Sequence, residues 1–376
     1  MKNYYPAPPI ADQESLTSLG TLLEFLEGSA EELGWVVNLV MLSSSRSLEN
    51  IFEKWGTVHD SKRLNITQPA WVLYPQRHLH DHQIIQWFII EYSPGIVLLI
   101  STEHRDLIHA PINKWIQRYR PLLAPALLST PTMRRIFNSV SQMEGTKSKV
   151  MLDQVSWKGK LPVPTTRKFL ESNRLWTERP FDQVFDDLRD QKKWATSVHF
   201  SFAYSQPVNN HPRQVQGALY RNGEITSTGC LSSLFNSVID KATEEIIIDR
   251  KFFSKRGSED SPTGQFKPLV IQYDEPVFAD KTQNYLLIKV IESIPKTGVS
   301  ILHPNPYLHA AVVDYIDGST YDIWVVHPNR INIVPKVRAT AASLERICAH
   351  VCVDFRDGDI WDYEEVLTQD TADNDK

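Results

Sequence analysis

Apolar residues recur at helical spacing through the first fifty residues. Leu16, Leu19, Leu23 and Leu26 recur at steps of three and four, which predicts an amphipathic helix. The Ser29-x-x-Glu32 string has the form of a capping box and predicts a second helix, with Leu33, Val36, Val37, Val40 and Met41 on one stripe. Leu48, Ile51, Phe52 and Trp55 then predict a third helix. The chain therefore opens with a helical region.

The pattern changes after residue 69. Residues 70–74, 83–91 and 96–101 are rich in β-branched and aromatic side chains, and Ser93-Pro94-Gly95 is a turn signal, so these runs predict a small antiparallel sheet. Helical spacing returns over residues 108–119 and again after Thr130 and Pro131. From residue 145 to residue 180 the periodicity is weak.

The second half of the chain begins with a short helix over 181–188 and continues with a hairpin region whose clearest turn is Asn222-Gly223. A strong helical stripe spans 231–242, and another spans 344–351. Alternating or β-rich runs predict strands at 268–273, 285–290, 299–303, 309–316, 321–327 and 331–334. We predict an α+β fold, with a helical N-terminal region on a small antiparallel sheet and a C-terminal region rich in antiparallel strands.

These changes in the residue pattern suggest that the chain is divided into domains. We expect an N-terminal α+β domain over 1–145, a basic connector over 146–180, a C-terminal α+β domain over 181–362 and an acidic disordered tail over 363–376. The tail has few apolar residues to bury.

Charge is distributed unevenly. The whole chain has a net charge of −5, but residues 105–179 hold 14 Lys and Arg against 5 Asp and Glu, a local net charge of +9. Such a segment is typical of a surface that contacts a polyanion, or of one that pairs with the acidic parts of the same chain. Both interpretations stay open.

Basic and aromatic residues in this segment are the candidate contacts for nucleic acid or for a partner subunit. Cations neutralise phosphates, and exposed aromatic rings stack on bases, which singles out Trp157 and Trp176. Lys114 and Arg118 share one side of the predicted 108–119 helix, and Arg134 and Arg135 lie off the apolar stripe of the next. The full candidate set is Lys114, Arg118, Arg134, Arg135, Lys158, Lys160, Arg167, Lys168, Trp157 and Trp176.

A competing hypothesis rests on histidines. His78, His80 and His82 alternate in the string RHLHDH, and alternate residues of an extended segment project to one side, as ligands of Zn²⁺ or Mn²⁺ do. The string resembles the HxHxDH motif of metallo-β-lactamase-type hydrolases but is one residue shorter. It supports the alternative function, a metal-dependent hydrolase or nuclease.

Other chemistry is sparse. The three cysteines, Cys230, Cys348 and Cys352, have no CxxC spacing and are typical of reduced thiols in the cytoplasm. No phosphate loop or dinucleotide motif occurs, so we expect no cofactor, and no apolar run is long enough for a membrane span. We expect a cytoplasmic, non-enzymatic component that binds nucleic acid or a protein subunit, of the kind found in multi-subunit prokaryotic systems such as antiviral defence.

Overall fold

A computed structural model shows how the chain folds, and it describes these residues: 14–34, 36–55, 60–74, 86–103, 105–120, 122–160, 170–206, 209–256, 267–279, 281–336 and 338–366. The described residues form two compact units. The first contains those up to Ile247, and the second contains those from Ile248 onward. Each unit is built around its own antiparallel sheet.

The sheet of the first unit has the strand order β2-β3-β4-β5-β1-β11-β10-β9-β7-β8, with β6 paired to the side of β1. Its strands are β1 (Val37–Ser44), β2 (Asp60–Arg63), β3 (Ala70–Tyr74), β4 (Trp87–Ser93), β5 (Ile96–Ser101), β6 (Leu123–Pro125), β7 (Met151–Lys160), β8 (Leu170–Pro180), β9 (Lys193–Gln206), β10 (Asn209–Tyr220) and β11 (Glu224–Ser227). The small sheet expected over residues 70–101 is therefore one part of a larger one.

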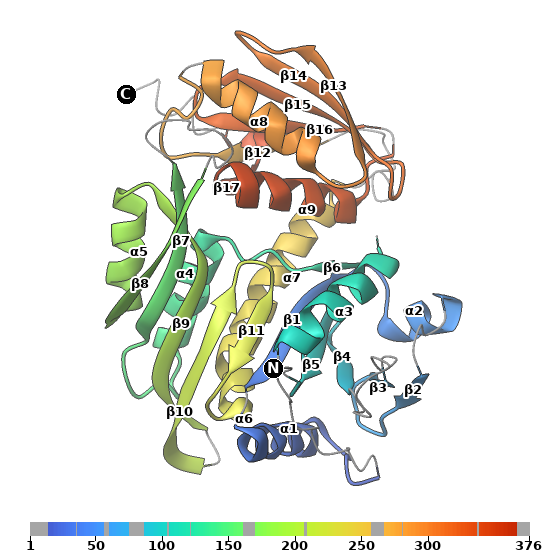
Figure 1. Cartoon of the computed structure of the whole chain (residues 1–376), viewed down its shortest axis with the longest axis vertical. Coiled ribbons are helices and arrows are strands. Elements are labelled where there is room, and N and C mark those ends of the chain that lie inside the picture. The colour runs from blue at the N-terminus through green and yellow to red at the C-terminus, as the bar shows by residue number, and fades with distance from the viewer. Residues whose placement is uncertain are drawn as a thin grey trace, which may run out of the picture. The chain divides into compact units, whose positions relative to one another are not determined.

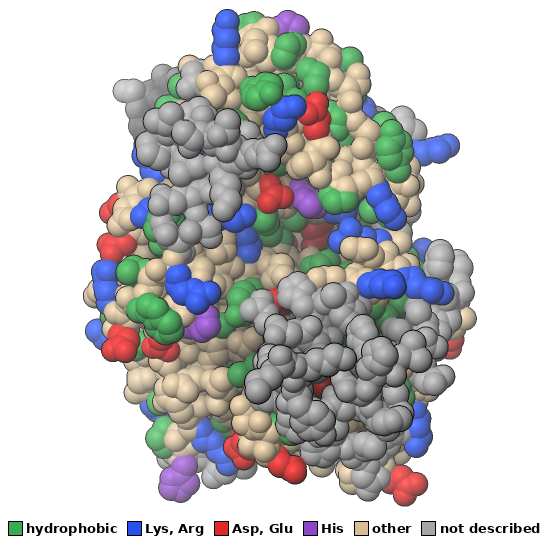
Figure 2. Space-filling model, viewed as in Figure 1, with side chains coloured by type: hydrophobic (Ala, Val, Ile, Leu, Met, Phe, Trp, Pro, Cys, Tyr) green, Lys and Arg blue, Asp and Glu red, His purple; other side chains and the backbone are tan. Residues whose placement is uncertain are grey.

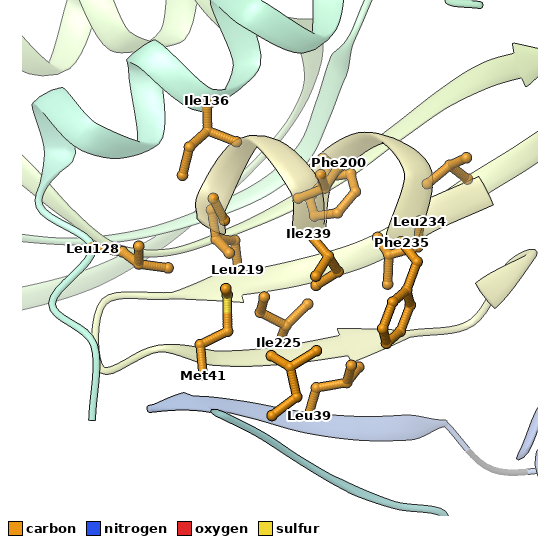
Figure 3. Close-up of a cluster of buried hydrophobic side chains, with 14 of the residues drawn as sticks. Leu39, Met41, Leu128, Ile136, Phe200, Leu219, Ile225, Leu234, Phe235 and Ile239 are labelled. Atoms are coloured by element: carbon orange, nitrogen blue, oxygen red, sulfur yellow. The ribbon is translucent and has the colours of Figure 1, made fainter. Parts of the chain in front are cut away.

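One side of this sheet is covered by helices along most of its width. They are α1 (Leu19–Leu33), α4 (Thr130–Gln142), α5 (Phe181–Asp190), α6 (Leu231–Leu234), the π-helical turn η1 (Phe235–Ile239) and α7 (Asp240–Ser254). Alternate residues of the strands point at them, so Leu39, Phe200 and Ile225 join Ile136 and Phe235 in one buried core. Figure 3 shows these side chains meeting between the helices and the strands.

The opposite side of the sheet is covered at one end only. The helices α2 (Leu48–Trp55) and α3 (Arg105–Arg118) pack there, and Ile51, Trp115 and Tyr119 form a second core with Leu99 and Trp87. This core lies over β1, β3, β4 and β5. The strands β7 to β11 therefore have one apolar side and one side that these helices do not cover.

The second unit has a sheet with the order β13-β14-β15-β16-β12-β17. Its strands are β12 (Leu269–Gln272), β13 (Thr297–His303), β14 (Leu308–Asp314), β15 (Thr320–His327), β16 (Arg330–Pro335) and β17 (Asp359–Asp362), and its helices are α8 (Lys281–Ser293), α9 (Ala341–His350) and the π-helical turn η3 (Val351–Phe355). Leu287, Ile323, Ile333, Leu344 and Cys348 are fully buried in this unit.

The α+β fold class predicted from the sequence is confirmed. Two element predictions are wrong. Residues 37–44 form the strand β1 rather than a helix. Every residue of β1 is buried, and its run Leu39–Leu42 is apolar on both sides of the sheet, so the alternation that marks a strand is missing there. Residues 285–290 belong to the helix α8, where Leu287, Ile288 and Ile291 form the buried stripe.

Two expected segments take a definite structure where the chain is described. Within 146–180, the strands β7 and β8 pair as a long hairpin in the first sheet. Residues 363–366, expected as the start of the acidic tail, form one turn of helix with Val366 buried. The domain ranges themselves stay a prediction.

A membrane span needs a long apolar helix. None of the helices in the described part of the chain meets both requirements of length and hydrophobicity.

Candidate functional site

Strict alternation along β9 gives the first sheet two unlike sides. Val198, Phe200, Phe202 and Tyr204 enter the core beneath α4, α5 and α6, whereas Ser197, His199, Ser201 and Ala203 point the other way. Successive residues of a strand face opposite sides, so the apolar run fixes where the polar one lies. The same holds for β10, where Val215 and Leu219 are in the core and Tyr220 faces away from it.

The strand register aligns these polar residues in rows. Trp176 of β8 lies opposite Gln154 of β7, which lies opposite His199 of β9, which lies opposite Ala218 of β10. Directly opposed residues of antiparallel strands project to the same side. Four strands therefore place a tryptophan and a histidine in one row.

The neighbouring row carries a cation and a phenol. Arg174 lies opposite Ser156, which lies opposite Ser197, which lies opposite Tyr220. The ring centroids of His199 and Tyr220 are 6.4 Å apart in an edge-on arrangement, so these aromatic groups touch across the two rows. We call this surface the polar face, defined by Gln154, Ser156, Lys158, Arg174, Trp176, Ser197, His199 and Tyr220.

Exposure differs among the residues of the polar face: Arg174 and Trp176 are exposed, whereas Gln154 and Ser197 are buried. Trp176 is 73% exposed on the outermost strand β8, and His199 and Tyr220 are half-buried. Figure 1 shows β9, β10 and β11 in front of α4 and α7. Figure 2 shows the same view, in which polar uncharged side chains and backbone dominate the surface over β9 and β10. Rings accessible on one side of a sheet are suited to stacking with planar groups.

Two cations belong to the polar face. Arg174 is exposed and Lys158 is half-buried, and within the described ranges neither has an ion-pair or hydrogen-bond partner. On the same strand as Lys158, Asp153 accepts a hydrogen bond from the Ser201 hydroxyl at 3.1 Å. Unpaired cations beside exposed rings are typical of a surface that meets an anion.

The basic residues of α4 and the end of β8 behave differently. Arg134 pairs with Asp186 at 2.7 Å, Arg135 with Glu245 at 2.7 Å, and Arg179 with Asp187 at 2.7 Å. These pairs lie on the helical side of the sheet, opposite the polar face. Acidic residues of the same unit therefore neutralise part of the basic segment 105–179. This agrees with the interpretation in which the segment pairs with acidic parts of the same chain.

The remaining sequence candidates are scattered. Lys114 and Arg118 are exposed on α3. Trp157 is only 9% exposed and belongs to the core, with the Lys193 ammonium 3.6 Å from its ring centroid, so the polar face presents Trp176 and not Trp157. Arg167 and Lys168 lie outside the described residues, and so does the side chain of Lys160.

Cys230 precedes α6 and has polar neighbours. Its sulfur lies 3.5 Å from an Arg213 guanidinium nitrogen and 3.3 Å from the hydroxyls of Ser232 and Ser233. Burial opposes ionisation of this thiol, but these hydrogen bonds outweigh burial and lower the pKa of Cys230. His199 faces the other side of the sheet, so the structure does not bring a histidine of β9 to this thiol as a catalytic partner.

Glu103 is a buried acid just beyond β5. It is 1% exposed, and one of its carboxylate oxygens has no hydrogen-bond partner. Burial raises the pKa of Glu103 from 4.5 to about 7, against a smaller opposing effect of a backbone hydrogen bond with Gln86. The Asn38 amide donates to the Glu103 carbonyl oxygen at 3.0 Å, which anchors this residue to β1.

Metal-binding chemistry has no support in the described residues. Their His, Cys, Asp and Glu side chains nowhere form a group of three or more that is suited to a metal ion. Cys348 and Cys352 are both fully buried in the helical core of the second unit. His78, His80 and His82 lie outside the described residues, so the hydrolase alternative stays a prediction.

Comparison with known proteins gives no assignment: neither the family models nor the curated proteins include a match to this chain. The polar face therefore has to be interpreted from its own chemistry.

Several residues of the polar face are not among those predicted from the sequence. His199 and Tyr220 lie in a stretch interpreted only as a hairpin region, and Arg174 lies in a stretch of weak periodicity. The signal was present in residues 197–204, where large apolar residues alternate with Ser197, His199, Ser201 and the small Ala203. That alternation alone could have placed His199 on the solvent-facing side of a strand.

Proposed function

We propose that this protein is a non-enzymatic binding component that contacts nucleic acid through the polar face of its first sheet. The observation that carries the proposal is the register that aligns Trp176, His199 and Tyr220 beside the unpaired cations Lys158 and Arg174. Phosphates attract the cations, and aromatic rings stack on bases in a manner that tolerates any sequence.

Nucleic acid is favoured over a protein partner because of what the polar face contains. Its accessible serine, arginine, lysine and aromatic side chains offer hydrogen bonds, charge and stacking, whereas Gln154 and Ser197 are buried. The centre of a protein–protein interface is usually poor in charge and carries a closely packed apolar core. The apolar residues of these strands are committed instead to the core beneath α4 and α6.

The cellular setting is part of the same proposal. All three cysteines are free thiols, which supports a cytoplasmic location. Membership of a prokaryotic defence system rests on association alone and adds nothing to the chemistry of the polar face.

A pair of double variants tests the proposal. Lys158→Ala with Arg174→Ala removes two cations from the polar face, and Arg134→Ala with Arg135→Ala removes two from the opposite side of the same unit. Both lower the net charge of the protein equally. Affinity for a labelled 20-nucleotide strand is measured over a range of salt concentrations.

We expect the first double variant to lose affinity and to reduce the slope of log K against log salt by about 1.4 units, since each phosphate contact with a single strand contributes about 0.7. The second should keep the slope of the unsubstituted protein, because its arginines are already paired. Equal slopes for both variants, or no binding by the unsubstituted protein at low salt, would reject the proposal.

A further inference from the structure

We infer that the nucleic acid bound by the polar face is single-stranded, with a base stacked on Trp176. This inference rests on the proposed function and names the form of ligand that the face takes. It follows from three features: the exposure of the Trp176 ring, the small number of cations on the polar face, and the extended sheet surface on which these side chains stand.

The first feature is the placement of the Trp176 ring. β8 is the last strand of the sheet, and its residues alternate so that Leu175 lies opposite the core residue Val155 while Trp176 lies opposite Gln154 of the polar face. Trp176 is 73% exposed. A ring with this much free surface can stack only on a base whose own face is free. Bases in a duplex are stacked on their neighbours, whereas those of a single strand can turn outward.

The spacing across the sheet supports more than one stacking position. Trp176 and His199 are separated by the single strand β7 in their row. Neighbouring strands lie about 4.8 Å apart, so these two side chains start roughly 10 Å apart. Between them lies Gln154, which is only 3% exposed, so the two rings are the accessible groups of this row. An unpaired strand crossing β8, β7 and β9 would meet the Trp176 ring and then the His199 ring.

The second feature is the small number of cations. A duplex presents one negative charge per about 1.7 Å of its axis, and proteins that bind it use many phosphate contacts. The polar face has Lys158 and Arg174, while Arg134, Arg135 and Arg179 are held in ion pairs on the other side of the sheet. Two cations with several stacking groups match a single strand, for which base stacking supplies much of the affinity.

The third feature is the shape of the binding element. Proteins that read a duplex insert a helix or a two-stranded ribbon into a groove. Here the polar side chains stand on the surface of an extended sheet, in register across β8, β7, β9 and β10. A sheet surface of this kind can support splayed bases but cannot enter a groove.

The test compares single-stranded and duplex ligands of one sequence with matched variants of the full chain. Trp176→Ala removes the ring, Trp176→Phe keeps a smaller one, and Leu175→Ala alters the adjacent residue, which is 50% exposed but lies on the other side of the strand. Binding of a labelled 20-nucleotide strand and of its 20-base-pair duplex is measured at one salt concentration.

We expect the single strand to bind at least about tenfold more tightly than the duplex, and Trp176→Ala to weaken its binding by about 5- to 150-fold, as loss of one stacked base does. Trp176→Phe should recover part of that loss, and Leu175→Ala should bind like the unsubstituted protein. Equal or tighter binding of the duplex, or an affinity unchanged in Trp176→Ala, would overturn this inference alone. Failure to bind either ligand would overturn the proposed function as well.

Discussion

The two sides of β9 differ sharply in composition. One carries Phe200 and Phe202 into a core closed by α4, α5 and α6, and the other carries Ser197 and His199. Burial of the apolar side favours formation of the sheet and fixes the register of its strands, because a shift of one residue would bury the polar side chains. The polar side adds nothing to this core, and its cations and exposed ring are what the proposed contact with nucleic acid rests on.

The largest expected effect lies on the apolar side. Phe200 is buried and its ring centroid lies 5.3 Å from that of Phe137 on α4, so Phe200→Ala should leave a cavity between sheet and helix. We expect a loss of about 3–5 kcal/mol in the free energy of unfolding. Urea denaturation followed by circular dichroism measures it. A loss below about 1 kcal/mol would contradict the position of Phe200 in the core.

A smaller effect on stability is expected at the buried acid Glu103, and it should depend on pH. Burial raises its pKa to about 7, so between pH 4.5 and pH 7 the folded chain holds a proton that the unfolded chain has released. Stability from this group is present at low pH and is lost as the pH rises through that range. Relative to the isosteric Glu103→Gln, the unsubstituted protein should lose on the order of 1 kcal/mol between pH 5 and pH 8.

Thermal unfolding of both proteins over this pH range provides the measurement. The difference between them isolates Glu103 from other titrating groups. A constant difference in stability across the range would show that Glu103 is ionised throughout.

The charged pairs on the helical side should matter less. Arg134 and Arg135 are 31% and 48% exposed, and ion pairs of this kind contribute about 0–1 kcal/mol each. Arg134→Ala with Arg135→Ala should therefore lower the unfolding midpoint only slightly, and high salt should reduce the difference further. A loss above about 3 kcal/mol would indicate that these arginines hold α4 to α5 and α7 far more strongly than their exposure implies.

The smallest effect on stability is expected on the polar face. Trp176→Ala changes a ring that is largely in solvent, so the free energy of unfolding should stay within about 0.5 kcal/mol of the unsubstituted protein. Chemical denaturation checks this directly. Together with Phe200→Ala, it would show that one side of the sheet contributes far more to stability than the other.

Local patterns predicted much of this fold, and where they failed the reason is specific. The helices around Ile136 and Leu344 follow directly from their apolar spacing. The strand β1 escaped prediction because Leu39 and Val40 are buried on opposite sides of the sheet, which erases the alternation that marks a strand. The helix α8 contains Tyr285 and Ile288 in a run that also suits a strand, and only packing decides between them.

The candidate site was less predictable than the fold. Trp176 could be singled out by type, but its neighbours His199 and Tyr220 are brought beside it by pairing between strands far apart in the sequence. Trp157 shows the converse, since only the register reveals that it faces the core. Residue type suggests chemistry, and long-range pairing decides which residues can act together.

Footprinting of side chains by hydroxyl radicals, with and without a saturating 20-nucleotide strand, tests the central claim most directly. Trp176 and Leu175 are adjacent, both are exposed, and they lie on opposite sides of β8. If nucleic acid lies on the polar face, oxidation of Trp176 and Tyr220 should fall on binding while oxidation of Leu175 stays unchanged. Protection of Leu175 with Trp176 still reactive would contradict the claim and place the ligand on the helical side of the sheet.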